Sequence, residues 1–438
     1  MTMASRRESG LKRVFRVLAI LVSALLLLVA GAASYLWLLH GQAALEGYRS
    51  PLRGQLKSGG EVTSPLSPQV VWVIVDGLRY DAVQAMPTLS SLKLQGASAQ
   101  VLGRAPTYSQ PAWTTLVTGA SGHIGANLVR ALLARDDLDA VDVCLHNNFH
   151  APVSIAVLES GKNCYCEKPI AGSYADGKAM VDAARRTGRM LSIQLALLFS
   201  KETKIANRLI ADGHLGELYH ARSTGFRRRG RPYVDGYGTA SFVRKETAAG
   251  GALFDMGVYH ISRILYLLGR PAVKRISGKI YQKTGMDAAR RESSGYNVEE
   301  LGLGFVKFAG DLTLDLIESW AIHLGGFEGS SIVGSQGGIR LDPFSFHTTL
   351  SDVEMNATFE MDSVDWRWHQ LDPTQAYYDS PQKHWVAALR GDCALIPTDE
   401  IALDTMLISE GIYLSDRLGR EVTAEEVEQH STSTAVTL

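Results

Sequence analysis

The chain has 438 residues, of which 46% are hydrophobic, with 44 Lys and Arg against 45 Asp and Glu. This length and apolar fraction are typical of a globular protein with about two or three domains. The balanced charge argues against a nucleic-acid partner. Four cysteines in so long a chain exclude a disulfide framework.

The N-terminus has the pattern of a membrane anchor. Basic residues between Arg6 and Arg16 precede an uncharged apolar run over 17–39, which is long enough for a bilayer-spanning helix of about 20 residues. Because positive charge marks the cytoplasmic end of such a helix, residues 1–16 are predicted in the cytoplasm, with the rest of the single-pass chain outside. A cleaved signal peptide is the alternative. If the segment is an artefact, the protein is cytoplasmic.

A polar linker over 40–68 leads into a segment, 69–119, that begins with a buried strand ending at Asp76. Ser109 stands on a later loop, before a predicted helix. A carboxylate at a strand end and a hydroxyl on a following loop open a metal-assisted phosphoryl-transfer site. The segment resembles the phosphodiesterase branch of the alkaline-phosphatase superfamily, which implies Asp76 as a metal ligand and Ser109 as the nucleophile. The further Asp and His ligands of that family do not follow, so a fragment without a site is favoured, and we predict no metal.

Gly119, Gly122 and Gly125 precede an apolar helical run. Glycines so placed permit a tight turn and the close approach of a pyrophosphate to a helix N-terminus. Their spacing resembles that of extended short-chain dehydrogenases and epimerases, and they are candidate cofactor-binding residues. The ribose-reading residue expected about twenty residues further on, after a second strand, is missing. We therefore predict a truncated Rossmann-like domain over 117–197 and interpret the chain as a mosaic of joined segments.

Beyond the glycines, strand and helix patterns alternate. Predicted strands over 140–145, 163–166 and 190–195 are separated by predicted helices over 152–159 and 174–187. This alternation predicts parallel strands with crossover helices. In the second strand, Cys164 and Cys166 are expected on one face and Tyr165 on the other.

After residue 197 the pattern changes to that of an α+β domain over 198–428. A helix over 201–212 is followed by period-two alternation, which predicts a large, open, mostly antiparallel sheet. Its strands are expected over 218–224, 273–282, 301–308 and 312–320. We also predict a strand at 366–369, closing helices over 382–389 and 400–418, and a disordered tail over 429–438. The fold class is therefore α/β, an incomplete Rossmann-like parallel sheet followed by this second domain, behind a transmembrane helix.

The strongest chemical signal is the run Glu167–Lys168–Pro169 at the end of a predicted strand. A partly desolvated lysine shifts its pKa readily, and a base works best when its pKa lies near the operating pH. Further along, Asp255 and Tyr259 stand four residues apart and would share one face of a helix. These motifs resemble those of the Gfo/Idh/MocA oxidoreductases, and the resemblance covers about residues 137–430.

The resemblance implies roles for individual residues. Lys168 takes the position of the family's catalytic lysine, and Asp255 with Tyr259 or His260 would bind substrate hydroxyls and relay the proton. His260 points about a third of a turn away from Tyr259 and has a packing role as its alternative. Glu167, Asn147 and His150 match positions near the cofactor, although His150 has helix capping as an alternative.

The resemblance also implies NAD or NADP as the cofactor and a sugar or cyclitol as the substrate. It further implies an oligomer contact through the C-terminal sheet. Two alternatives stay open: a non-catalytic mosaic that cannot hold the cofactor, and a membrane-anchored phosphodiesterase fragment.

Overall fold

The computed structural model describes residues 133–436. The predictions for the preceding residues lie outside this range, namely the anchor over 17–39, the linker, Asp76, Ser109, Gly119, Gly122 and Gly125. Within the described range no helix is both long enough and apolar enough to cross a bilayer. The predicted anchor stays a prediction.

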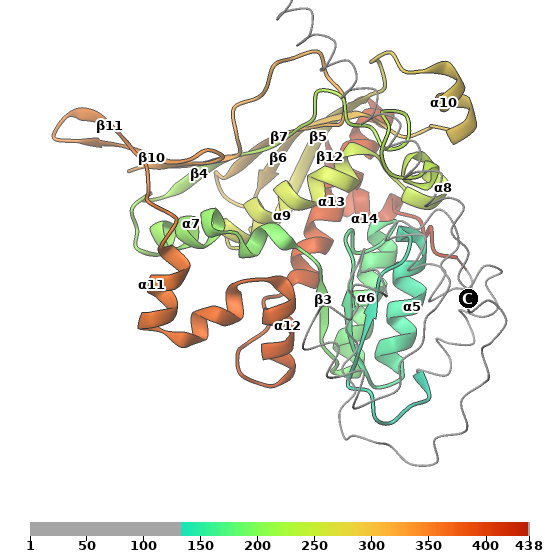
Figure 1. Cartoon of the computed structure of the whole chain (residues 1–438). Coiled ribbons are helices and arrows are strands. Elements are labelled where there is room, and N and C mark those ends of the chain that lie inside the picture. The colour runs from blue at the N-terminus through green and yellow to red at the C-terminus, as the bar shows by residue number, and fades with distance from the viewer. Residues whose placement is uncertain (1–132, 437–438) are drawn as a thin grey trace, which may run out of the picture. The chain divides into compact units, whose positions relative to one another are not determined.

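The first part of the described chain is a small α/β domain. Three parallel strands, β1 (Ala140–Val143), β2 (Asn163–Cys166) and β3 (Leu191–Ile193), lie side by side in that order. Helices α5 (Asn147–Glu159) and α6 (Tyr174–Thr187) are the crossover connections (Figure 1). The predicted alternation of strands and helices is confirmed.

Local signals explain how α6 begins and ends. The Ser173 hydroxyl accepts a hydrogen bond from the Asp176 amide, which satisfies one of the free donors at the helix start. Gly188 ends the helix with a φ of 64°, a conformation that glycine adopts at no steric cost. In β2, Cys164 and Cys166 are buried free thiols, and Tyr165 between them is buried as well.

The second part contains a nine-stranded sheet in the order β11-β10-β9-β8-β4-β7-β6-β5-β12. All neighbours are antiparallel except β4 (Leu218–Phe226) and β7 (Thr313–Ser319), which are parallel. The large, mostly antiparallel sheet is therefore confirmed. Its other strands are β5 (Val273–Tyr281), β6 (Leu301–Phe308), β8 (Ser331–Gly334), β9 (Gly338–Leu341), β10 (Phe344–Leu350), β11 (Val353–Ala357) and β12 (Val422–Thr423).

Helices complete this part of the fold. They are α7 (Lys201–Ala211), α8 (Lys245–Ala248), α9 (Val258–Leu267), α10 (Ala288–Ser294), α11 (Val364–Leu371), α12 (Pro381–Leu389), α13 (Thr398–Leu418) and α14 (Ala424–His430). The long helix α13 contacts β5, α9, α6 and β3. It therefore touches both sheets.

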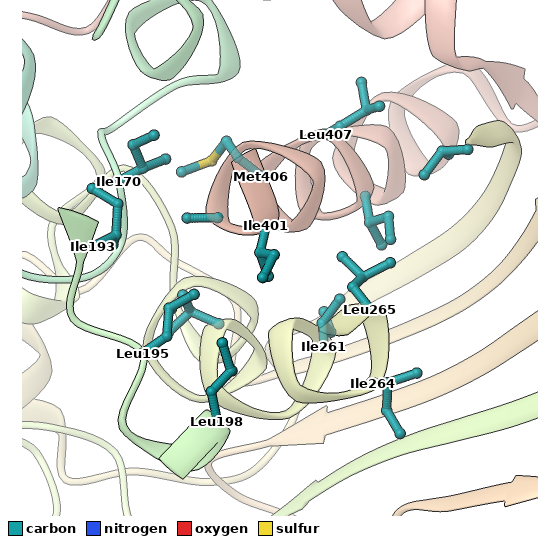
Figure 2. Close-up of a cluster of buried hydrophobic side chains, with 14 of the residues drawn as sticks. Ile170, Ile193, Leu195, Leu198, Ile261, Ile264, Leu265, Ile401, Met406 and Leu407 are labelled. Atoms are coloured by element: carbon teal, nitrogen blue, oxygen red, sulfur yellow. The ribbon is translucent and has the colours of Figure 1, made fainter. Parts of the chain in front are cut away.

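A continuous hydrophobic core links the two sheets through α13. Figure 2 shows Ile401 and Met406 of α13 in the same cluster as Ile193 of β3 and Ile261 and Leu265 of α9. All five side chains are almost completely buried, and each contributes about 1.5–3 kcal/mol by leaving water. The core fixes α9 relative to the parallel strands.

One predicted strand is wrong. Residues 366–369 lie in helix α11, where Trp368 covers the Arg208 guanidinium at 3.6 Å from the ring centre. The two tryptophans two positions apart suggested a strand, but four residues are too short a run to distinguish the two periodicities.

The prediction of a disordered tail from residue 429 is also wrong for the described part. Helix α14 extends to His430, and the segment 431–436 runs along the first domain. The Thr434 amide donates to the Asp176 carboxylate at 2.8 Å, and the Val436 amide donates to the Asn148 carbonyl at 3.1 Å.

Candidate active site

A cavity of about 520 Å³ lies at the carboxyl ends of β1 and β2. The loops that follow these strands supply Asn147 and Lys168, and the second domain supplies Arg227, Asp255 and Tyr259. Open α/β sheets bind ligands at the carboxyl ends of their strands. A larger, more open hollow of about 1270 Å³ lies over β8–β10, but it contains none of the predicted site residues, so the smaller cavity is the candidate site.

Lys168 follows β2, and its side chain points toward Asp255 of the second domain. Its Nζ is 3.1 Å from Oδ1 of Asp255 and 3.2 Å from the Asp255 carbonyl oxygen. It also lies 4.4 Å from the centre of the Tyr259 ring, within cation–π distance. The side chain is only 14% exposed. Three residues predicted from the sequence thus lie together in the cavity.

Lys168 and Asp255 form an ionised pair, which differs from the neutral lysine that desolvation alone would favour. Burial lowers the pKa of Lys168, but the charge of Asp255 and the nearby Tyr259 outweigh burial and hold the pKa above the ordinary value of 10.5. Burial raises the pKa of Asp255, but Lys168 and Arg227 hold it below 3.8. Lys168 is therefore an ammonium group at neutral pH, poised to donate a hydrogen bond. The sequence suggested that desolvation would bring the pKa of Lys168 toward neutrality. The charge of Asp255 raises this pKa instead.

Asp255 lies in a π-helical turn, Leu253–Gly257, that continues into α9. A π turn contains one extra residue and frequently occurs at functional sites. Asp255 Oδ2 accepts a hydrogen bond from Trp320 Nε1 at 3.0 Å and lies 3.5 Å from Arg227 Nη1. Lysine, arginine and indole therefore hold one carboxylate in place.

His260 lies outside the cavity lining. Its Nδ1 is 2.9 Å from Oε2 of Glu318, a fully buried carboxylate that also accepts a hydrogen bond from Ser223. His260 is not among the residues that line the cavity. The structure brings Tyr259, but not His260, to Lys168, and a proton-relay role for His260 stays a prediction.

Two of the residues predicted near the cofactor line the cavity. The Asn147 side-chain amide donates to the Ala248 carbonyl at 2.7 Å, which ties α5 to the second domain. Glu167 accepts a hydrogen bond from the Lys168 amide at 3.1 Å. Burial raises the pKa of Glu167, and the charge of Lys168 opposes the rise.

His150 is completely buried inside α5 and joins two loops. Nδ1 lies 2.7 Å from the Pro169 carbonyl and Nε2 lies 3.0 Å from the Leu145 carbonyl. Burial lowers the pKa of His150 to about 4. The ring is therefore neutral at pH 7 and donates only one of these contacts. His150 supports the loops that follow β1 and β2 and does not line the cavity.

Neither Trp320 nor Arg227 belongs to the sequence motifs that predicted the site. Each follows the last residue of one of the two parallel strands, and Phe226 pairs with Ser319 in the register of β4 and β7. Parallel strands end at the same edge of a sheet, which brings Arg227 and Trp320 to the same carboxylate. Only the non-local pairing of β4 with β7 reveals this.

The fold and the cavity define a two-domain α/β protein whose second domain closes a site at the strand ends of the first. Residues 89–195 match the family model described as "Oxidoreductase family, NAD-binding Rossmann fold", and residues 203–340 match the "GFO/IDH/MocA C-terminal domain". Together these matches span more than half of the 438 residues. The chain belongs to the Gfo/Idh/MocA family.

Several curated proteins are similar to the chain. It is 30% identical over 226 residues to D-glucoside 3-dehydrogenase of Escherichia coli, and the aligned region covers 50% of this chain and 63% of the relative. It is 24% identical over 306 residues to D-apiose dehydrogenase of Paraburkholderia graminis, and the aligned region covers 68% of this chain and 76% of the relative. The chain thus spans less than two thirds of the length of the first of these relatives.

Solved structures share the fold. An oxidoreductase domain protein from Kribbella flavida superposes with a TM-score of 0.57 at 19% identity, covering 70% of this chain and 88% of that chain. Levoglucosan dehydrogenase in complex with NADH and levoglucosan superposes with a TM-score of 0.53 at 18% identity, covering 67% and 82%. At these identities the likeness concerns the fold alone.

The matches also change the extent of the family resemblance. The NAD-binding match begins at residue 89, upstream of residue 137, where the motifs suggested that the resemblance begins. The matches do not support the epimerase-like or phosphatase-like resemblances of the preceding segments.

Proposed function

We propose that this protein is an NAD-dependent oxidoreductase that interconverts a hydroxyl group of a sugar or cyclitol and the corresponding carbonyl. The observation that carries the proposal is the Lys168 ammonium group, held 3.1 Å from the Asp255 carboxylate at the end of β2. Relatives named as D-glucoside 3-dehydrogenase and levoglucosan dehydrogenase support a sugar-like substrate.

The polar groups at the strand ends fit the nicotinamide end of the cofactor. Asn147 and Glu167 line the first-domain wall of the cavity beside Lys168, where the rule for open α/β sheets expects a ligand. When bound, the nicotinamide supplies or accepts the hydride. The glycines proposed to hold the pyrophosphate lie outside the described residues.

The charges in the cavity suit a reacting oxygen. Lys168 would donate a hydrogen bond to the substrate oxygen and stabilise the negative charge that develops there. In the reduction direction the proton passes from Nζ to the new alkoxide, and oxidation reverses this transfer. The neutral amine regains its proton from solvent; Asp255 keeps Nζ oriented and its negative charge favours the ammonium form, while the Tyr259 ring covers that group.

Cofactor titration of the full-length chain, purified in mild detergent, tests the proposal. We expect saturable binding of NADH, followed by fluorescence, and turnover of a candidate sugar or polyol. Lys168→Ala should reduce turnover by roughly 10²–10⁴-fold, because a positioned acid or base contributes that much, and should leave cofactor affinity unchanged. Lys178→Ala, an exposed lysine on α6, is the matched control and should behave like the wild type.

A flat titration with both NADH and NADPH would overturn the proposal. It would favour the alternative of a non-catalytic mosaic that folds but holds no cofactor. Cofactor binding with full activity in Lys168→Ala would instead reject the assignment of Lys168.

A further inference from the structure

Two adjacent carboxylates stand immediately before β6 and are almost completely buried. Glu299 is 5% exposed and Glu300 is 1% exposed. Glutamate is rarely buried to this extent unless its charge is paired or hydrogen-bonded. The two side chains contact different segments, and each of these segments supplies residues to the cavity wall.

Glu299 caps the start of the helix that carries the proposed catalytic residues. Its carboxylate accepts hydrogen bonds from the Gly251 amide at 2.9 and 3.0 Å and from the Leu253 amide at 2.9 Å. Its carbonyl oxygen accepts the Ala252 amide at 3.3 Å. Glu299 thus takes up three consecutive amide groups that have no partner within the helix, two residues before Asp255.

The close approach depends on glycine at position 251. A Cβ atom there would lie 1.9 Å from the Glu299 carbonyl oxygen, which no side chain tolerates. Glycine at position 251 therefore reflects contact with Glu299, whereas a Cβ atom at Gly250 would meet Tyr413 and Phe254. Burial raises the pKa of Glu299, and the amide hydrogen bonds from Leu253 and Gly251 oppose the rise.

Glu300 holds the loop on the other side of the cavity. Its Oε2 lies 2.9 Å from Nη1 of Arg231, a side chain that is 1% exposed. Arg231 also binds both carboxylate oxygens of Asp235, at 2.8 and 3.1 Å, and the carbonyls of Thr284 and Gly285. This network fixes the loop 227–238, which contributes Arg227, Pro232, Tyr237 and Gly238 to the cavity.

We propose that Glu299 and Glu300 are a pair of positioning residues that set the two second-domain walls of the site independently. Glu299 orients Asp255 and Tyr259 toward Lys168. Glu300, through Arg231, orients the loop 227–238 toward the substrate. The proposal rests on the oxidoreductase function proposed above for this cavity.

The two carboxylates should have separable effects on catalysis. In Glu299→Gln, the side-chain amide cannot accept every hydrogen bond that the carboxylate accepts, so Asp255 shifts relative to Lys168. We expect kcat to fall roughly tenfold to a hundredfold, because small misplacements of reacting groups cost that much, with the substrate KM unchanged. In Glu300→Gln, we expect the substrate KM to rise about tenfold with kcat nearly unchanged, because the loop makes binding contacts.

Hydrogen exchange gives a readout that does not depend on activity. In the full-length protein without cofactor or substrate, Glu299→Gln should speed amide exchange in peptides covering 251–253 and leave those covering 227–238 unchanged. Glu300→Gln should do the reverse. Glu292→Gln, an exposed glutamate on α10, is the matched control and should change neither kinetics nor exchange.

The outcomes separate the two proposals. If the wild type shows no turnover, the oxidoreductase proposal fails, while the exchange pattern still decides whether the two glutamates act on different walls. Unchanged exchange at 251–253 in Glu299→Gln, or equal effects of both variants on kcat and KM, would overturn the positioning proposal. If Glu299→Gln does not fold, Glu299→Asp keeps the charge and carries the same expected pattern.

Discussion

A single carboxylate organises the charges of the candidate site. Asp255 is shared by Lys168, Arg227 and Trp320, so two cations face one anion on the second-domain wall. The surplus positive charge suits an oxygen that becomes negative during reaction. The ionised Asp255 also explains why burial does not neutralise Lys168, because the carboxylate lies within hydrogen-bond distance of Nζ.

Replacing Asp255 with Asn should change the titration of Lys168. Burial alone lowers the pKa of Lys168, so without the neighbouring charge we expect the pKa to fall below 10.5. The pH profile of kcat/KM should then gain an ionisation that the wild type lacks between neutrality and pH 10.5. Trp320→Phe, which removes a hydrogen bond to Asp255 but no charge, is the control. An unchanged profile in Asp255→Asn would contradict the prediction.

The same substitution has a stability signature whose sign follows from the pKa directions. The lowered pKa of Asp255 contributes stability above pH 3.8, and this stability is lost as the pH falls through the folded-state pKa. The raised pKa of Lys168 contributes stability below pH 10.5, and this stability is lost as the pH rises through the folded-state pKa. The wild type should therefore exceed Asp255→Asn in free energy of unfolding by about 1–3 kcal/mol between these limits, and by less outside them. Urea unfolding across pH measures this difference.

At the scale of single elements, helix α5 contains a defect that the C-terminal segment repairs. Pro152 lies inside α5 and has no amide hydrogen to donate to the carbonyl four residues earlier. That carbonyl belongs to Asn148, and it accepts the Val436 amide at 3.1 Å instead. The segment 431–436 thus supports the start of α5, where Asn147 enters the cavity.

Val436→Pro tests this contact. The substitution removes the amide donor, leaves the Asn148 carbonyl without this partner and should lower the free energy of unfolding by about 1–3 kcal/mol. We also expect weaker cofactor binding, because the α5 start becomes less well fixed. Val436→Ala keeps the amide and is the matched control. Equal thermal midpoints and equal cofactor affinities for the two variants would reject a role for the segment.

The sequence predicted those elements that local patterns specify. The three parallel strands and the helix over 174–187 follow from the local apolar pattern, and the structure adds Ser173 and Gly188 as the caps of that helix. Residues 366–369 were assigned wrongly because two tryptophans alternate over too few positions. The positions of Lys168, Asp255 and Tyr259 were predictable from their motifs. The contribution of Trp320 was not, because it depends on the pairing of β4 with β7, which are separated by 86 residues of chain.

At the scale of the whole described molecule, the site depends on a core that both sheets share. Lys168 follows β2 of the small sheet, whereas Asp255 and Tyr259 belong to the helix that α13 holds against the large sheet. Because Ile401 of α13 belongs to the same buried cluster as Ile193 and Ile261, a loss of packing at this point should be felt on both sides of the cavity. Packed interiors transmit such changes.

Ile401→Ala tests whether the two sheets unfold together. The cavity that it creates should cost about 2–5 kcal/mol and lower the thermal midpoint. It should also speed labelling of the buried thiols Cys164 and Cys166 in β2, followed by peptide mapping, although neither thiol belongs to α13. Leu350→Ala on β10, where the side chain is 64% exposed, is the control and should change neither quantity. A lower midpoint with unchanged labelling of both thiols would mean that the small sheet keeps its structure independently, and that the core does not couple the two walls of the site.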